Sequence, residues 1–252
     1  MVVGVDKFRE HFAGHEDQYA LIGGTACDLL FANAGIDFRA TKDFDMVLCV
    51  EVVDASFAAA FAGFLDSGGY AARQKSDGHK EYFRFHKPSD QNYPYMIELF
   101  SRKPGGIDIP DEHIYTKVPV DENDLSLSAI LLDENYYTAL QSSRTVLDGI
   151  SLLNEELLIP FKAKAYLDLS ERKLEGEKIS GKQINKHRND VFRLAQLLPA
   201  DLRVDITEPI RSDFRGFLDA VRADETFDPR AFGVAASRTE AIALLEGVYF
   251  IS

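Results

Sequence analysis

Residues 19–26 read Tyr-Ala-Leu-Ile-Gly-Gly-Thr-Ala, and residues 43–48 read Asp-Phe-Asp-Met-Val-Leu. The first stretch predicts a short apolar strand, Tyr19 to Ile22, that runs into a Gly-Gly turn and then a helix with apolar residues at helical spacing. Thr25 is typical of a helix N-cap, because its hydroxyl can accept from a free backbone N–H. The second stretch predicts a β-rich strand from Phe44 to Val50. A strand, a glycine turn, a helix and an acidic strand therefore follow one another along the chain.

The Gly23-Gly24 turn has the composition of a phosphate-binding turn. Glycine lets the backbone come close to a phosphate, and a helix N-terminus offers free N–H groups and the positive end of the helix dipole. A glycine turn between a strand and a helix is also a common plain connection. Taken alone, the turn fits both interpretations.

Asp43 and Asp45 are separated by one residue in the predicted strand. Residues i and i+2 of a strand point to the same face, so the two carboxylates lie side by side and repel each other. A divalent cation removes this repulsion, and Mg²⁺ prefers oxygen ligands from one or two carboxylates together with substrate phosphates. The pair alone also fits two solvated aspartates at the start of a strand. Its occurrence after the glycine turn favours the metal site.

Glu98 lies in the apolar stretch Tyr95-Met96-Ile97-Glu98-Leu99-Phe100. An acid within an apolar strand must be exposed on one face or paired. Glu98 shares its face with Met96 and Phe100 rather than with polar residues, which favours a partner for the carboxylate. A metal ion and a structural salt bridge fit this pattern about equally well.

The rest of the chain predicts an α+β fold, with a mixed sheet flanked by helices and followed by a helical C-terminal domain. Strands are predicted at 70–74, 81–86 and 95–101, with a hairpin turn at 76–78 and a loop with one short strand at 103–124. Helices are predicted at 6–16, from Asp54 to the Ser67-Gly68-Gly69 break, and at 134–143, 155–173, 182–198, 207–223 and 237–248. The predicted helix that begins at Asp54 carries Phe57, Phe61 and Phe64 on one face, and these side chains are expected in the core.

Two domains are expected, residues 1–150 and residues 151–252, because the pattern becomes helical from about residue 134. Pro160 is expected in the first turn of its helix, where the missing N–H costs least. The stretch 174–185, with Gly176 and Gly181, is expected to connect two helices.

Composition and charge limit the class of protein. The 252 residues are 46% hydrophobic and 27% charged, with a net charge of −13, which argues against a general nucleic-acid binder. Residues 1–150 hold 13 Lys and Arg against 24 Asp and Glu, whereas residues 162–193 hold nine basic against five acidic groups. Cys27 and Cys49 are expected to be buried thiols, and a cytoplasmic location without membrane contact is expected. No transmembrane segment or signal peptide is predicted.

These motifs resemble the DNA polymerase beta-like nucleotidyltransferase superfamily. The resemblance rests on Gly23-Gly24-Thr25-Ala26, on Arg39-Ala40-Thr41-Lys42-Asp43-Phe44-Asp45 and on Glu98. Within the superfamily the chain is similar to the AbiEii/AbiGii-type group of nucleotidyltransferase-like toxins. Two helical segments add to the resemblance, Phe161-Lys162-Ala163-Lys164-Ala165 and Lys186-His187-Arg188-Asn189-Asp190-Val191. The segment of 17 residues between Thr25 and Asp43 is longer than the shortest spacing in the family.

The resemblance implies attack of a hydroxyl on the α-phosphate of a nucleoside triphosphate, with pyrophosphate leaving. Asp43, Asp45 and Glu98 would be the catalytic residues and the ligands of Mg²⁺ or Mn²⁺. Five residues would bind the nucleotide: Gly23, Gly24, Thr25, Lys162 and Lys164. Each lysine alone fits a solvated helix face better than a phosphate site. The resemblance also implies a toxin with a cognate antitoxin as its partner.

Three functions are compatible with the sequence. The first is an active nucleotidyltransferase whose acceptor is an RNA end, a protein hydroxyl or a small molecule; the basic region 162–193 weakly favours RNA. The second is a nucleotide sensor that binds without turnover, which the presence of all three acids disfavours. The third is an interaction module, for which substitution of Asp43 or Asp45 by alanine would be neutral or stabilising.

Overall fold

The computed structural model describes residues 2–49, 53–71, 82–100, 116–117, 130 and 133–251. The chain divides into two compact units, each of which is described by itself. The first unit comprises Met1–Asp121 and Arg144–Asn154, and the second comprises Glu122–Ser143 and Glu155–Ser252. The predicted boundary at residue 150 falls inside a segment of the first unit, and the chain passes between the units three times rather than once.

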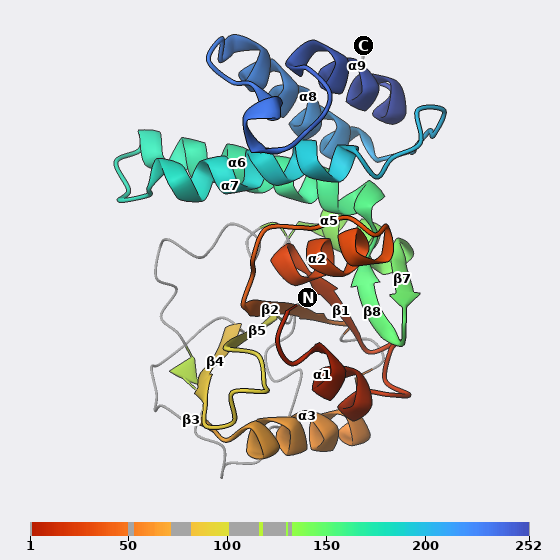
Figure 1. Ribbon diagram of the computed structural model, residues 1–252, viewed down its shortest axis with the longest axis vertical. Coiled ribbons are helices and arrows are strands. Elements are labelled where there is room, and N and C mark those ends of the chain that lie inside the picture. The colour runs from red at the N-terminus through yellow and green to blue at the C-terminus, as the bar shows by residue number, and fades with distance from the viewer. Residues whose placement is uncertain are drawn as a thin grey trace. The chain divides into compact units, whose positions relative to one another are not determined.

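The first unit is a mixed sheet with helices. Its helices are α1 (Val5–His11), α2 (Gly23–Asn33) and α3 (Ala55–Gly68). Its strands are β1 (Tyr19–Ile22), β2 (Asp43–Leu48), β3 (Tyr70–Ala71), β4 (Tyr82–Pro88), β5 (Met96–Phe100), β6 (Thr116–Lys117), β7 (Arg144–Leu147) and β8 (Ile150–Leu153). The strand order is β3-β4-β5-β2-β1-β8-β7 (Figure 1). Strand β6 pairs with β4. Parallel pairing of β2 with β5 and antiparallel pairing of β2 with β1 make the sheet mixed, which confirms the predicted α+β class.

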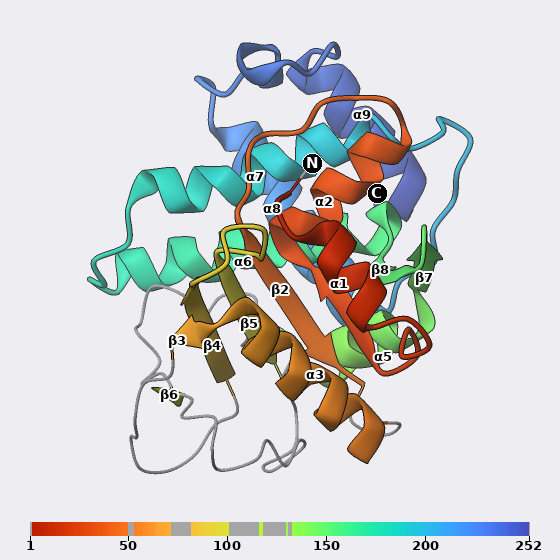
Figure 2. The same cartoon turned by 60° about the horizontal axis from the view of Figure 1, so that its bottom comes forward.

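An aromatic core covers one face of this sheet. Phe8 of α1 contacts Phe44 of β2 and Phe64 of α3, with ring centroids 5.2 and 5.7 Å apart. Phe57, Phe61 and Phe64 are fully buried, as predicted. Helices α1 and α3 therefore lie on the face of the sheet that carries Phe44 (Figure 2). Because successive side chains of a strand alternate, Asp43 and Asp45 point to the opposite face.

The β7–β8 hairpin lies between the predicted helices 134–143 and 155–173, in a stretch for which no strand was predicted. Its strands are joined by Asp148-Gly149, and both residues have positive φ, 49° and 74°. Two central residues with positive φ are what a type I′ hairpin turn requires, and Asp-Gly is a preferred sequence for it. The hairpin completes the sheet of the first unit through parallel pairing of β8 with β1.

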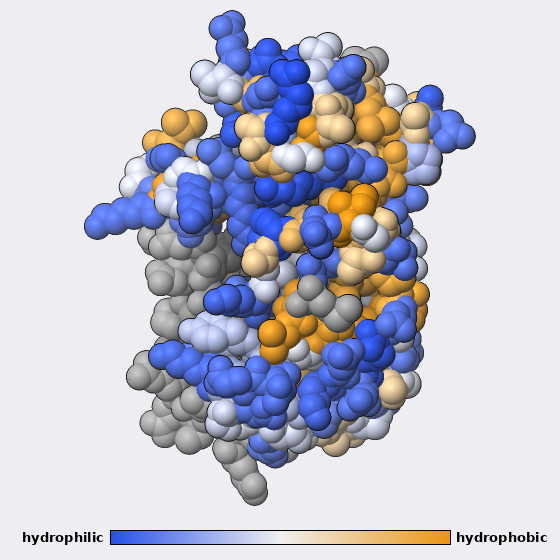
Figure 3. All heavy atoms as spheres, in the orientation of Figure 1, coloured by the Kyte–Doolittle hydropathy of each residue, from blue (hydrophilic) through white to orange (hydrophobic). Residues whose placement is uncertain are grey.

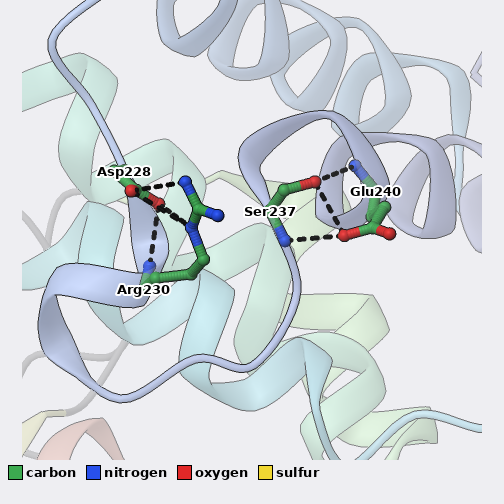
Figure 4. Close-up of polar contacts among 4 residues, drawn as sticks. All are labelled: Asp228, Arg230, Ser237 and Glu240. Atoms are coloured by element: carbon green, nitrogen blue, oxygen red, sulfur yellow. Dashed lines mark hydrogen bonds and ion pairs between the residues drawn. The ribbon is translucent and has the colours of Figure 1, made fainter.

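The second unit is helical, as predicted. It contains α5 (Glu134–Ser142), α6 (Glu155–Leu174), α7 (Gly181–Ala195), α8 (Glu208–Ala223), the 3₁₀ helix η1 (Pro229–Phe232) and α9 (Arg238–Tyr249). Capping boxes begin α7 at Ser180 and α9 at Ser237. At the start of α9, the Ser237 N–H donates to Glu240 Oε2 at 2.8 Å, and the Glu240 N–H donates back to Ser237 Oγ (Figure 4). Such caps satisfy the free N–H groups that every helix leaves at its first turn.

Pro160 lies inside α6 rather than in its first turn, so that expectation was wrong. A proline has no N–H, and its position in a helix leaves the carbonyl four residues earlier without its usual donor. That carbonyl belongs to Glu156, and the Tyr249 hydroxyl of α9 donates to it at 2.6 Å. A tertiary hydrogen bond therefore replaces the missing helical one.

Other boundaries differ by small amounts. Helix α1 ends at His11 rather than at residue 16, and the connector between α6 and α7 spans 175–180 rather than 174–185. The predicted turn at 76–78 and most of the predicted loop at 103–124 lie outside the described residues. Cys27 and Cys49 are buried and free, as expected.

The visible surface of α6 and α7 is largely hydrophilic (Figure 3). Four lysines of these helices and their connector are exposed: Lys173, Lys178, Lys182 and Lys186. Among the helices that the structure describes, none is long and apolar enough to cross a membrane.

Candidate functional site

The glycine turn and the acidic strand meet at the end of β1. In the antiparallel β1–β2 pair, Ile22 lies opposite Asp45, so the turn that follows Ile22 is next to this carboxylate. Gly23 has a φ of 68°, and a Cβ added to it would lie 1.8 Å from Asp45 Oδ2. The carboxylate of Asp45 therefore rests against the Gly23 backbone at the start of α2. Only glycine supplies both this φ and the space.

Position 24 requires glycine only because there is no room for a side chain. Its φ is not in the left-handed region, but an added Cβ would lie 2.6 Å from the Oγ1 atom of Thr41. Thr41, Asp43 and Asp45 are spaced two residues apart, so an extended backbone brings their side chains to one side. Thr41 and Asp45 thus cover two successive glycines of the turn. Thr41 was not predicted as a site residue, although its two-residue spacing from Asp43 is visible in the sequence.

Thr25 does not cap the helix, which corrects that prediction. Helix α2 begins at Gly23, and Ile22 is its N-cap, with no side-chain cap bond. The Thr25 side chain is fully buried within the first turn of the helix. Its hydroxyl donates to the backbone carbonyl of Asp43 at 2.5 Å. The residue therefore links the helix to the acidic strand.

Glu98 reaches the same face from the neighbouring strand. Strands β2 and β5 are parallel, with Asp45 opposite Glu98 and Asp43 opposite Met96. Neighbouring strands lie about 4.8 Å apart, so residues in register have adjacent side chains on one face. Asp43, Asp45 and Glu98 are all half-buried. The structure therefore brings the three predicted acids to one face of the sheet, with Gly23 and Gly24 at its edge.

The arrangement of the acids has two further features. Within the described part of the chain, the Asp45 carboxylate has no hydrogen-bond or ion-pair partner. In the same part of the chain, no three His, Cys, Asp or Glu side chains are placed so that together they could hold a metal ion. Carboxylate oxygens are nevertheless the ligands that Mg²⁺ prefers, and Mg²⁺ commonly takes only one or two of them. The donor set fits Mg²⁺ or Mn²⁺ completed by phosphate oxygens.

Lys162 and Lys164 lie on α6 in the second unit, and both have acidic partners there. Lys162 is 1% exposed, and its Nζ lies 3.4 Å from Asp190 Oδ2 of α7. Asp190 is fully buried and also lies 3.3 Å from Arg193 Nη1. The structure therefore shows how the charge of Lys162 is balanced, while its role in binding a triphosphate stays a prediction.

Lys164 belongs to a second charged group. Its Nζ lies 3.3 Å from Asp168 Oδ1 and 3.2 Å from Asp213 Oδ1 of α8. The Tyr136 hydroxyl of α5 donates to the other oxygen of Asp213 at 3.0 Å. Burial lowers the pKa of Lys164, but the two carboxylates raise it, and the net shift is upward. This lysine stays protonated and ties three helices of the second unit together.

The comparisons with known proteins include a similarity to a solved structure. No protein-family model matches the chain, and no curated protein matches it. The chain is similar to the crystal structure of an antigenic nucleotidyltransferase-like protein from Paracoccidioides brasiliensis, with 14% identity and a TM-score of 0.48. The match covers 98% of this chain and 99% of that one.

Proposed function

We propose that the chain is a metal-dependent nucleotidyltransferase, which moves a nucleoside monophosphate from a nucleoside triphosphate to a hydroxyl acceptor. One observation carries the proposal: the Asp45 carboxylate lies against Gly23 at the start of α2 and in register with Glu98 on the adjoining strand. A turn without side chains at a helix N-terminus suits phosphate groups, and the adjacent acids suit the cations that accompany them.

Each residue has a defined part in this reaction. The backbone N–H groups of the Gly23-Gly24 turn would donate to the β- and γ-phosphates. Asp43 and Asp45 would hold Mg²⁺ or Mn²⁺, and Glu98 would share in holding one of the ions; bound there, such ions neutralise phosphate charge. The acceptor oxygen attacks the α-phosphorus, its proton passes to the Glu98 carboxylate, and the bond to the bridging oxygen breaks to release pyrophosphate. Lys162 and Lys164 are further candidates for binding the triphosphate.

Nucleotide-dependent thermal stability tests the proposal. A ligand that binds only the folded protein stabilises it by about 2.7 kcal/mol at a concentration of 100 times Kd. We expect one or more of ATP, GTP, CTP and UTP to raise the melting temperature only when Mg²⁺ or Mn²⁺ is present. Asp45→Ala should abolish the shift. Asp17→Ala, which removes an exposed acid of the same unit, is the matched control and should retain it.

No shift with any nucleotide, in a folded wild-type protein, would contradict the proposal and favour an interaction module. A metal-dependent shift would justify a transfer screen with α-labelled nucleotide and three classes of acceptor: RNA ends, proteins and small molecules. Labelled acceptor together with released pyrophosphate is the expected product.

A nucleotide-binding module without turnover is the second candidate. The observation that favours it is the lack, among the described residues, of three acidic or metal-binding side chains grouped to hold an ion. Such a module would give the thermal shift without releasing pyrophosphate in the presence of any acceptor class. Pyrophosphate release above the level of Asp45→Ala would exclude it.

The resemblance to AbiEii/AbiGii-type proteins extends the proposal to a toxin that is neutralised by a cognate antitoxin. Sequence resemblance alone supports this extension. Expression in a bacterial host should arrest growth, and Asp45→Ala should relieve the arrest. Growth equal to that of an empty-vector strain would count against the toxin role while leaving the transferase activity open.

A further inference from the structure

We propose that Thr25 is a positioning residue, which fixes the acidic strand against the glycine turn and thereby sets the metal affinity of the Asp43–Asp45 pair. The proposal rests on the proposed function, because it concerns the same site. It assigns Thr25 a different part from that of a phosphate ligand. The first observation is that the Thr25 side chain is fully buried and that its hydroxyl proton is directed to the Asp43 carbonyl at 2.5 Å. A phosphate oxygen needs a donor, and this donor is already engaged.

The second observation concerns the end of the β1–β2 ladder. The paired residues of these strands run from Tyr19↔Leu48 to Ile22↔Asp45, so the ladder stops at Asp45. Asp43 lies two residues beyond that end, outside the paired residues of β1 and β2. On its other side, Asp43 is in register with Met96 of β5. The Thr25 hydroxyl therefore holds β2 at a residue that lies beyond the end of this ladder.

The third observation is the close fit of the flanking residues. Thr41 lies over Gly24, and Asp45 lies over Gly23, each at a distance that would not admit a Cβ. Asp43, which accepts the hydrogen bond of Thr25, lies between Thr41 and Asp45 in the sequence. A carbonyl held at this point fixes the plane of the next peptide, and with it the directions of the Asp43 and Asp45 side chains. Loss of the hydroxyl would let the start of β2 move and would separate carboxylates that must converge on a cation.

Groups that orient metal ligands typically contribute 10- to 100-fold to metal affinity. We therefore expect Thr25→Val, which keeps the side-chain shape, to weaken Mn²⁺ binding at least about 10-fold. Thr25→Ser keeps the hydroxyl and should bind Mn²⁺ within about threefold of the wild type. Thr25→Ala should behave like Thr25→Val. The exposed Thr138→Val of α5 is the matched control and should match the wild type.

The measurement is a titration of the whole protein with Mn²⁺ alone, followed by the electron paramagnetic resonance signal of free Mn²⁺. Circular dichroism verifies that each variant is folded. If Thr25→Val does not fold, Thr25→Ala against Thr25→Ser gives the same comparison, since these two side chains differ by the hydroxyl only. A phosphate-ligand role predicts unchanged Mn²⁺ binding without nucleotide and weaker binding of a nucleoside triphosphate.

Unchanged Mn²⁺ affinity in folded Thr25→Val or Thr25→Ala, with a wild type that binds Mn²⁺, would overturn the positioning role and leave the proposed function standing. Equal losses in Thr25→Ser and Thr25→Ala would also overturn it, because the hydroxyl would then make no difference. A wild type that binds neither Mn²⁺ nor a nucleoside triphosphate would overturn the proposed function and the positioning role together.

Discussion

Acids occupy sheltered places in both units, but their neighbours differ. In the second unit, Asp190 lies beside Lys162 and Arg193, and Asp213 lies beside Lys164. In the first unit, Asp45 lies against the Gly23 backbone and next to Glu98, and no described residue donates to its carboxylate or forms an ion pair with it. A buried charge beside its counter-ion has its charge balanced within the fold, whereas a sheltered acid beside another acid would be stabilised by a cation. The contrast separates structural charges from charges that are suited to a ligand.

Removal of Asp190 should give the largest loss of stability. Asp190→Ala leaves the buried Lys162 ammonium without its nearest carboxylate, and breaking a buried pair from one side costs about 3–5 kcal/mol of unfolding free energy. Denaturant unfolding measures the loss. Arg230→Ala removes an exposed pair with Asp228 (Figure 4) and should leave the unfolding midpoint unchanged. A loss below about 1 kcal/mol for Asp190→Ala would mean that the pair is not structural.

A side chain at Gly23 should disturb the fold and the site together. Gly23→Ala forces an L-residue to a φ of 68° and directs its Cβ into the Asp45 carboxylate. Left-handed backbone at a non-glycine residue costs about 1–3 kcal/mol, and the collision adds to that cost. Gly14→Ala is the control, because Gly14 has a φ of 85° and no atom lies within 4 Å of an added Cβ. Equal melting temperatures for the two variants would contradict the close contact with Asp45.

Neutralising Asp45 should separate stability from binding. Asp45→Asn relieves repulsion with the neighbouring acids and loses no described partner, so the unfolding free energy without metal should stay within about 0.5 kcal/mol of the wild type or rise. Binding of Mn²⁺, measured by calorimetry, should fall below detection. If Asp45→Asn lost as much stability as Asp190→Ala, Asp45 would be a structural charge like Asp190, and the contrast between the acids of the two units would be wrong.

The smallest effect should be a change in the pH dependence of stability at Asp224 of the second unit. The Thr226 hydroxyl lowers the pKa of Asp224 below 3.8, and the Arg188 guanidinium lowers it further against the opposing effect of burial. A carboxyl whose pKa is depressed on folding stabilises the protein above its unfolded pKa and loses this contribution as the pH falls through the folded pKa. The stability difference between wild type and Asp224→Asn should therefore be constant at neutral pH and shrink below pH 3.8. Urea unfolding at pH 7, 5 and 3 measures it, and a difference that grows towards pH 3 would contradict the assignment.

Features that depend on the spacing of residues close together in the sequence could be predicted. Amphipathic spacing predicted the helices of the second unit, and the two-residue spacing of Asp43 and Asp45 predicted their common face. The β7–β8 hairpin was missed because four-residue strands carry little periodicity, although Asp148-Gly149 is a strong hairpin signal. Thr25 was predicted as an N-cap because threonine is common at that position, and nothing in the local sequence shows that its hydroxyl donates to the Asp43 carbonyl of β2.

Two partners of the α6 lysines, Asp190 of Lys162 and Asp213 of Lys164, were beyond sequence reasoning for a similar reason. Asp190 and Asp213 lie on other helices, and which faces of α6, α7 and α8 meet is set by packing. The register of Asp45 with Glu98 likewise depends on how β2 and β5 align. Long-range pairing, rather than residue type, decided these contacts.

The proline in α6 has a consequence for how the second unit opens. The Glu156 carbonyl is satisfied by a hydroxyl 93 positions away, so the hydrogen bonding of α6 is complete only when α9 is docked. Burial raises the pKa of Tyr249 well above 10.0, so this hydroxyl keeps its proton throughout the range in which carboxylates and histidines titrate. Movement of Tyr249 away from α6 would leave the Glu156 carbonyl without this donor, so the hydrogen bonding of α6 near Pro160 depends on the position of α9. The amide protons of α6 around Pro160 and those of α9 should accordingly exchange with solvent as one cooperative group.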